Sequence, residues 1–313
     1  MFSFVTRRLL SGVVLVFVIS TITYALIYSS TGNVARNILG ENATEQQVAA
    51  KTAELGLDQP LLVQYFTWLR NAITGDFGIS WFNSEPVTAA LVSRIPITLS
   101  MVVSAMVFIA LISAVLGITA AVRGGWVDRL IQVVSVIGFS LPNFWVALIL
   151  VLTFSLSLHL LPATGYIPPS ESVVGWAATL LLPVTALVLG GVASAAQQIR
   201  GATIDVLRQD YIRTLHARGL SPQSVVLKHA LRNAAGPALT VLSLQFIALL
   251  GGAVVIERVF AIPGLGTLTV NAALVGDVPL LMGIVVVMVI LVVIVNLAID
   301  ITNGWVNPKV RVQ

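Results

Sequence analysis

Charged and hydrogen-bonding side chains gather in one stretch of this otherwise apolar chain, residues 203–232, which holds five basic and two acidic residues. Attraction to anionic lipid would account for the charge, but it leaves the local punctuation unexplained. Gly219 is suited to end one helix, and Ser221-Pro222 is suited to begin another. Two short helices meeting at a glycine turn indicate a surface that docks a protein.

The first of these helices is predicted from its apolar spacing. Ile204, Leu207, Tyr211 and Leu215 recur at intervals of three, four and four residues, which places them on one face of an amphipathic helix. This face would pack inward, and the charged residues between these positions would remain exposed.

Motifs for catalysis are missing from the sequence. It contains no GxxxxGK[ST] loop for ATP, and no HExxH, GxSxG or plausible carboxylate pair. Its lack of cysteine excludes disulfides and thiolate metal sites. We therefore expect no catalytic residue, no metal site and no cofactor held by this chain, and a net charge of +4 does not indicate nucleic-acid binding.

The elements that must position the docking surface are membrane helices. The chain is 57% apolar and only 10% charged, too few charges to cover a water-exposed surface. Long apolar runs occur at 9–29, 97–122, 130–161, 176–199, 234–256 and 280–299. The third run is too long for one straight span of a ~30 Å core, and Pro142 is expected to kink or divide it. We predict an all-α integral membrane protein with six transmembrane helices.

The basic residues predict the orientation. With the N-terminus inside, twelve Lys and Arg residues lie in cytoplasmic segments and five outside, as the positive-inside rule requires. Both termini are then cytoplasmic. The predicted organisation is an N-terminal transmembrane helix (1–30), an extracytoplasmic segment (31–93), a transmembrane domain (94–302) with the docking helices at about 203–232, and a cytoplasmic tail (303–313).

Two outer segments have local signals. Thr44 and Gln47 form a predicted capping box, with Gly56 closing the helix that follows, and a solvated external cap accounts for this segment. The loop at 257–279 is apolar but interrupted by glycine and proline, so a short helix of about 265–275 between turns is expected there.

The centres of the predicted spans carry no ionisable residue, which disfavours an ion-coupled secondary carrier. A structural scaffold subunit is disfavoured by the docking helices. Energy for active transport would come from a partner. Gln245, Gly251 and Gly252 are candidates for lining the pathway, although close helix packing explains each of them equally well.

A family resemblance runs through nearly the whole chain. DYIRTLHARGL at 210–220, continued by KHALRNAAGPALT, resembles the EAA loop of ABC importer permeases, in the form found in the dipeptide/oligopeptide/nickel branch. The other matching blocks are LGLDQPLLVQY at 55–65, GDFGIS at 75–80, RIPITL at 94–99, SLPNFW at 140–145, LLPATGY at 160–166, ERVFAIPGLGTL at 257–268 and NPKVR at 307–311. The chain looks like the first of the two paralogous permeases. It departs from the general EAA pattern at Arg213, in place of the glutamate, and at Leu215, in place of the second alanine.

The resemblance implies a type I ABC importer permease fold, a second permease, two P-loop ATPase subunits that bind ATP and Mg, and an extracytoplasmic substrate-binding protein, in a bacterial or archaeal plasma membrane. The sequence has no internal repeat, which independently calls for a second chain around a central pathway. The implied ATPase-coupling residues are Asp210, Tyr211, Arg213, Ala217, Arg218, Gly219 and Leu220. The loop expected to face the binding protein includes Phe260, Pro263, Gly264, Leu265 and Gly266. Peptides are the expected cargo, with nickel chelates, glutathione and haem as alternatives.

Overall fold

The computed structural model describes residues 2–28 and 34–306. Within these ranges the chain is helical, and β-structure is limited to an isolated antiparallel bridge between Ile79 and Pro86. The chain divides into two compact units. Unit 1 is built mainly from Leu99–Ile262, and unit 2 from Thr6–Thr98 and Pro263–Val293.

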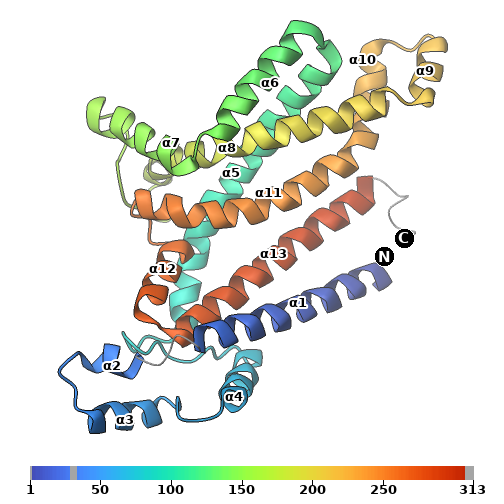
Figure 1. The fold of residues 1–313 in the computed structure, drawn as a ribbon. Helices are drawn as coiled ribbons and strands as arrows, with labels where there is room; N and C mark the ends of the chain where they lie inside the picture. Colours follow the sequence, from blue (N-terminus) through green and yellow to red (C-terminus); the bar gives the residue numbers. More distant parts are fainter. Residues whose placement is uncertain (1, 29–33, 307–313) are drawn as a thin grey trace. The chain divides into compact units, whose positions relative to one another are not determined.

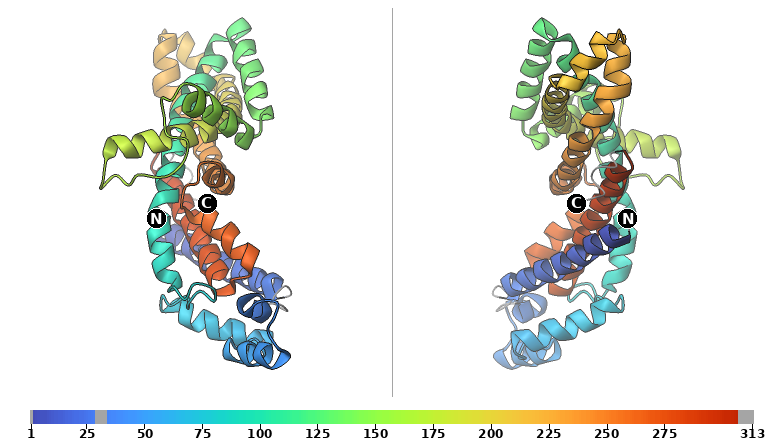
Figure 2. Two further views of the ribbon diagram at one scale, coloured as in Figure 1. Left: turned by 90° about the vertical axis from the view of Figure 1, so that its left-hand side faces the viewer. Right: turned by 90° about the vertical axis from the view of Figure 1, so that its right-hand side faces the viewer.

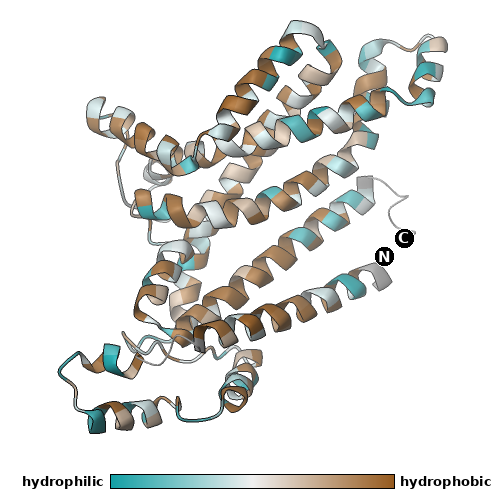
Figure 3. Ribbon diagram, in the orientation of Figure 1, coloured by the Kyte–Doolittle hydropathy of each residue, from teal (hydrophilic) through white to brown (hydrophobic). Residues whose placement is uncertain are grey.

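Five helices in the described ranges are long and apolar enough to cross a membrane, each by itself. Figure 3 shows the apolar character of α1 and α13 along most of their length, in contrast to the hydrophilic α3 and α9. The five helices are α1 (Phe2–Tyr28), α5 (Val87–Arg123), α8 (Val173–Leu207), α11 (Leu231–Val259) and α13 (Val278–Val306). All five overlap apolar runs that the sequence predicts as spans.

The sixth predicted span is a broken helix, as the excess length of the run at 130–161 suggested. It consists of α6 (Gly125–Ser140), α7 (Asn143–Leu150) and a π-helical segment, η2 (Val151–Ser157). The two parts meet at an angle of 91°, a corner visible in Figures 1 and 2. Pro142 lies at this corner with φ −62° and ψ 133°. A proline forces the residue before it out of the helical region, and Leu141 is extended, with φ −85° and ψ 123°. The helix α6 therefore ends here, and α7 begins directly after the proline.

Unit 1 is organised around α8, which packs against α6, α7 and α11. Small residues allow the helices to approach closely. A Cβ on Gly117 of α5 would lie 2.7 Å from the backbone oxygen of Ala196, and a Cβ on Gly138 of α6 would lie 3.3 Å from the Ala193 Cβ. Small residues at such crossings are the usual means of helix association in lipid, where there is no hydrophobic force between helices.

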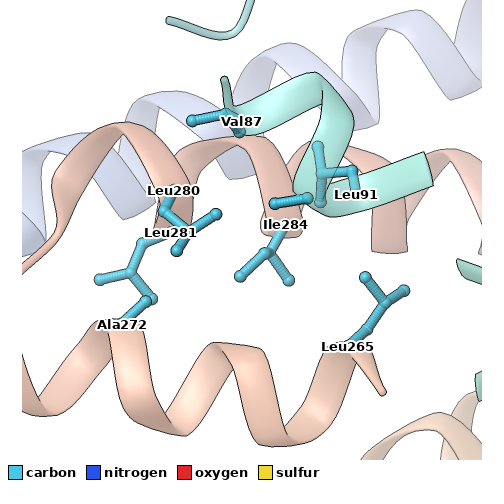
Figure 4. Packing of buried hydrophobic residues seen from close by; sticks show 8 residues of the cluster. Val87, Leu91, Leu265, Ala272, Leu280, Leu281 and Ile284 are labelled. Atoms are coloured by element: carbon cyan, nitrogen blue, oxygen red, sulfur yellow. The ribbon is translucent and has the colours of Figure 1, made fainter. Parts of the chain in front are cut away.

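Unit 2 contains the outer helices α2 (Val34–Leu39), α3 (Glu45–Glu54), α4 (Leu61–Ile73) and α12 (Leu265–Val275). The capping box predicted at Thr44 and Gln47 is present, and Gly56 has the positive φ, 69°, expected after the end of α3. The helix expected at about 265–275 is α12. Its Leu265 and Ala272 pack with buried residues of α5 and α13 (Figure 4).

Two predicted boundaries differ from the helix ends. The boundary between residues 93 and 94 falls inside α5, which begins directly after Pro86. The 37 residues of α5 reach about 55 Å, well beyond a ~30 Å hydrocarbon core. At the other end, residues 303–306 of the predicted tail belong to α13, and the remainder, with the block at 307–311, lies outside the described residues.

Candidate coupling, pathway and outer-loop sites

The docking segment begins where α8 ends. The prediction of the first docking helix is wrong about where that helix begins. Instead of one helix through Ile204 and Leu215, α8 ends at Leu207 and a separate short helix, α9 (Asp210–Ala217), follows. Gln209 between them is extended, with φ −71° and ψ 149°. The apolar spacing survives this break because Leu207, Tyr211 and Leu215 pack against the same buried cluster. Figure 1 shows α9 beyond the end of α8.

Gly219 ends α9 as the sequence predicts. Its φ is +81°, its N–H donates to the His216 carbonyl at 2.9 Å, and the Leu220 N–H donates to the Leu215 carbonyl at 3.3 Å. This pair of bonds is the Schellman motif, in which a left-handed residue satisfies the last carbonyls of a helix. Leu215 and Leu220 also pack on the same cluster, so the turn direction is fixed by both bonds and packing.

The second predicted short helix is the beginning of a long one. Ser221 accepts a hydrogen bond from the Ser224 N–H, and Pro222 occupies the first position of α10 (Pro222–Ser224), as expected. The helix then continues through the π-helical segment η3 (Val225–Ala230) into α11, giving one apolar helix over Pro222–Val259. The turn at Gly219 is therefore joined directly to a membrane helix.

The seven predicted coupling residues separate into two groups. The side chains of Tyr211 and Leu220 pack partly into the cluster formed by residues such as Ile212 and Val225, and the Tyr211 hydroxyl accepts a hydrogen bond from Asn233 Nδ2 at 2.9 Å. The other five are exposed: Asp210, Arg213, Ala217, Arg218 and Gly219. The exposed group can contact a partner, whereas the packed group holds α9 against the start of α11.

An ion pair braces α8 before it reaches α9. Arg200 donates through Nε and Nη2 to the two carboxylate oxygens of Asp128 at the start of α6, with 2.6 Å between Nη2 and Oδ2. The side chains are 26% and 15% exposed. Paired donors in this fork geometry fix orientation as well as distance. The sequence gives no signal for this pair, because the partners are 72 residues apart.

Two of the three candidate pathway residues, Gln245 and Gly252, lie at the junction of α7, α8 and α11. Two adjacent glycines of α8 leave room for two carboxamide side chains. A Cβ on Gly190 would overlap Oδ1 of Asn143, and a Cβ on Gly191 would lie 2.8 Å from Nε2 of Gln245. Both carboxamides are half-buried, and neither hydrogen-bonds another described residue. Sequence reasoning missed Asn143, whose signal was its place directly after Pro142.

The two predicted glycines of α11 differ in their surroundings. A Cβ on Gly252 would lie 3.4 Å from Leu187 and 3.8 Å from Asn143 Nδ2, so this glycine faces the same junction. Gly251 is exposed and has nothing within 4 Å of a Cβ position. Gly252 and Gln245 are seven residues apart, which is two helical turns, and they share one face of α11.

The loop expected to face a binding protein is largely packed. Phe260, Gly264, Leu265 and Gly266 are buried and Pro263 is half-buried. In unit 1 the Phe260 carbonyl accepts a hydrogen bond from the Gly165 N–H at 2.9 Å. In unit 2, hydrogen bonds also hold the backbone of Pro263 and Leu265. Arg94 Nη1 donates to the Pro263 carbonyl, and the Leu265 N–H donates to Thr98 Oγ1, each at 2.8 Å. These side chains shape the loop, and exposed neighbours must supply any contact with a partner.

An exposed candidate surface lies elsewhere in unit 2. Leu274 of α12 is 74% exposed, and with Val275 it borders an open depression of about 550 Å³ against the end of α2. Arg36 and Glu41 supply charge to its lining.

Asp277, which sequence reasoning also missed, is buried between the end of α12 and the start of α13. Its carboxylate accepts from the Ser80 hydroxyl and from the N–H groups of Trp81 and Leu280, which caps α13.

Five long apolar helices and one broken apolar helix in the described ranges define a polytopic membrane protein. Comparison with known proteins agrees with this class. The model of the family "Binding-protein-dependent transport system inner membrane component" matches residues 113–312, and that of "Binding-prot-dependent transport system membrane comp, N-term" matches residues 1–102.

Relatives match over the full length. A putative peptide transport system permease protein of Brucella abortus (strain 2308) is 36% identical over 312 residues, covering 99% of each chain. The glutathione transport system permease protein of Escherichia coli (strain K12) is 36% identical over 320 residues, with the same coverage. A solved chain of the inward-facing MetNI methionine ABC transporter superposes with a TM-score of 0.59 at 21% identity, covering 72% of this chain and 99% of that one.

The chain belongs to the family of binding-protein-dependent transport system inner membrane components. It is a multi-pass membrane permease subunit of an ABC importer, with the fold of that class. Members of this family are not themselves enzymes, since ATPase activity lies in partner subunits.

Proposed function

We propose that this chain is one of two paralogous permeases that together form the pathway of an ATP-driven importer for di- and oligopeptides. Two ATPase subunits, which bind ATP and Mg, drive it from the cytoplasm, and an extracytoplasmic binding protein delivers the cargo. In this arrangement the chain lies in a bacterial or archaeal plasma membrane with both termini cytoplasmic, consistent with the distribution of Lys and Arg along the sequence.

The observation that carries the proposal is the short helix α9 with its fixed turn. The five exposed residues of the predicted coupling set, which lie on α9 and the turn after it, present a small surface with an Arg213–Asp210 contact of 3.5 Å. The packed residues of α9 connect it to α11, while α8 enters it from the other side. A partner that moves α9 would therefore move the ends of two membrane helices as one body, which is a means of exchanging inward for outward access.

The cargo assignment rests on the relatives and on the pathway side chains. Relatives of equal identity are named for peptide transport and for glutathione transport, so glutathione, itself a tripeptide, is the second candidate. Carboxamides such as those of Asn143 and Gln245 offer both donors and acceptors to peptide groups. An unpaired carboxamide facing hydrocarbon would be costly, which supports a water-accessible or cargo-accessible position for them.

Coupling is tested by co-purifying the ATPase with the full chain. Arg213→Glu and Arg218→Glu on the exposed surface of α9 should abolish retention of the ATPase. Arg129→Glu makes the same charge reversal at an exposed site on α6 and should leave retention unchanged. Full retention by both α9 variants would contradict the assignment of this surface.

Cargo and pathway are tested in proteoliposomes that contain the complete transporter. ATP-dependent uptake of labelled dipeptide, competed by unlabelled peptide more strongly than by glutathione, is expected. Asn143→Leu and Gln245→Leu should reduce uptake severalfold while ATPase retention stays intact. Gln198→Leu, an exposed carboxamide of α8 that bonds Ser194, is the matched control. Uptake equal to that of the control would remove both residues from the pathway.

A further inference from the structure

The helix α4 has two apolar sides, and among the described residues only one of them is packed. On the packed side, Tyr65 is 3% exposed and lies in a cluster with Tyr24 and Met282, against which Trp68 and Leu69 also pack. On the other side, Leu62, Phe66 and Ile73 are 65%, 54% and 79% exposed. Their spacings of four and seven residues place them on one stripe.

The contacts of α4 set its depth along α1. The Tyr65 hydroxyl lies 2.9 Å from both the Ser20 and the Thr21 hydroxyls, and the Tyr24 hydroxyl donates to Gln64 Oε1 at 3.0 Å. By length and composition, the candidate membrane span of α1 runs over Val5–Ile27. At ~1.5 Å per residue, Ser20 is about 10 Å and Tyr24 about 4 Å inside its Ile27 end. The packed side of α4 thus reaches the level of the outermost turns of a membrane span.

The exposed stripe of α4 lies close to exposed apolar residues of α1. Phe17 of α1 is 45% exposed, and its ring lies 6.3 Å from that of the buried Tyr65. The exposed ring of Phe66 lies 5.5 Å from Tyr65. Exposed rings from α1 and from α4 therefore pack against the same buried tyrosine. Arg70, also exposed, follows Phe66 by one turn and can extend its guanidinium to lipid phosphate.

We propose that α4 is an interfacial helix that lies in the lipid monolayer at the Ile27 end of α1, with Leu62, Phe66 and Ile73 inserted among the acyl chains. In the orientation proposed above this is the outer leaflet. Such helices bury their apolar face ~5–10 Å into the boundary between headgroups and acyl chains. The expected solvated cap is then restricted to α2 and α3, and α4 anchors them to the membrane surface. The proposal does not depend on the cargo or on coupling to an ATPase.

The chain has no cysteine, so single cysteines can report the position of each site. Leu62→Cys, Phe66→Cys and Ile73→Cys are labelled with a nitroxide in the assembled transporter, in nanodiscs of phosphatidylcholine and phosphatidylglycerol. Collision rates with oxygen and with a water-soluble nickel chelate are then measured. Ala50→Cys, at an exposed site on α3, is the aqueous control. All four sites are exposed, so the labels should not disturb folding.

Labels at the three stripe positions should collide readily with oxygen and poorly with the nickel chelate, at a depth of ~5–10 Å, whereas Ala50→Cys should show the reverse. Nickel collision rates equal to those of the control would place α4 in water and overturn the proposal. Protection from both reagents would mean that another protein subunit covers the stripe, and this too would overturn it. Because three positions are read independently, failure of one labelled variant leaves the test intact.

Discussion

Gly219 is the residue on which the direction of the chain after α9 depends. Its φ of +81° is unfavourable for a residue with a β-branched side chain, although a Cβ there would meet nothing within 4 Å. Gly219→Val should therefore distort the turn at a cost of about 1–2 kcal/mol without a steric clash. We expect ATP hydrolysis to continue while peptide uptake falls severalfold, measured as the ratio of the two rates in proteoliposomes.

The matched control for Gly219→Val is Gly201→Val. Gly201 lies inside α8 with open space around its Cβ position and no positive φ, so the same side chain is added without backbone strain. Its ratio of uptake to hydrolysis should equal that of the unmodified chain. Unchanged uptake in Gly219→Val would show that the turn does not transmit the motion.

Asp277 is the residue that joins the turn before α5 to the start of α13. Asp277 is 2% exposed and its carboxylate accepts three bonds, so Asp277→Ala leaves the buried Ser80 hydroxyl and the half-buried Trp81 N–H without this acceptor. The expected loss of stability is about 2–3 kcal/mol, seen as a lower midpoint of thermal unfolding in detergent. Asp76→Ala removes an exposed turn carboxylate that accepts from the Gly78 N–H and should have a much smaller effect. Equal midpoints for the two variants would contradict the role of Asp277.

At the scale of elements, the crossing of α5 and α8 depends on Gly117. Its Cβ would lie 2.7 Å from the Ala196 backbone oxygen and 3.0 Å from the Arg200 backbone nitrogen, and backbone atoms cannot move aside locally. Gly117→Ala should separate the two helices and cost about 1–3 kcal/mol. Gly251→Ala makes the same change inside α11 in open space and should be neutral or stabilising by up to ~1 kcal/mol. Thermal unfolding of the two variants in detergent distinguishes these outcomes.

Local signals in the sequence were sufficient for several helix ends. The capping box at Thr44, the left-handed Gly219 and the Ser221-Pro222 start act within a few residues, so their outcome depends little on the rest of the fold. The break between Leu207 and Asp210 was not predictable in the same way. The apolar spacing passes through it unchanged because both sides pack on one cluster, and spacing alone reports the face of a helix but not its continuity.

Contacts between distant segments were beyond sequence reasoning. Nothing near Asn143 indicates that it meets Gly190, since the pairing depends on the corner at Pro142 and on where α8 crosses α7. The same holds for the outer loop. Its glycines and prolines correctly indicated turns around α12, but not that Leu265 would be buried by α5 and α13. The turn at Gly219 and the helix start at Ser221-Pro222 were therefore predicted from the sequence, whereas the start of α9 and the contacts of the pathway residues and the outer loop were not. The functional roles assigned to these residues stay predictions.

At the scale of the whole molecule, the proposed function depends on the orientation of the chain in the membrane. It requires α9 to be cytoplasmic, where an ATPase could act on it, and α3 to be extracytoplasmic, where a binding protein would approach. The distribution of Lys and Arg predicts this arrangement, and α9 is reached directly through α8 and α11. If the orientation were reversed, the proposed coupling surface on α9 would face away from the cytoplasm and could not contact an ATPase.

Single cysteines in this cysteine-free chain test that orientation. Ala217→Cys on α9 and Ala50→Cys on α3 are both exposed alanine sites, so each reacts with a maleimide if the reagent reaches it. With a membrane-impermeant maleimide, intact right-side-out vesicles should label only Ala50→Cys, and inverted vesicles only Ala217→Cys. Permeabilised vesicles should label both, which controls for reactivity. Labelling of Ala217→Cys in intact right-side-out vesicles would place α9 outside and exclude it as the site where an ATPase acts, whatever the cargo.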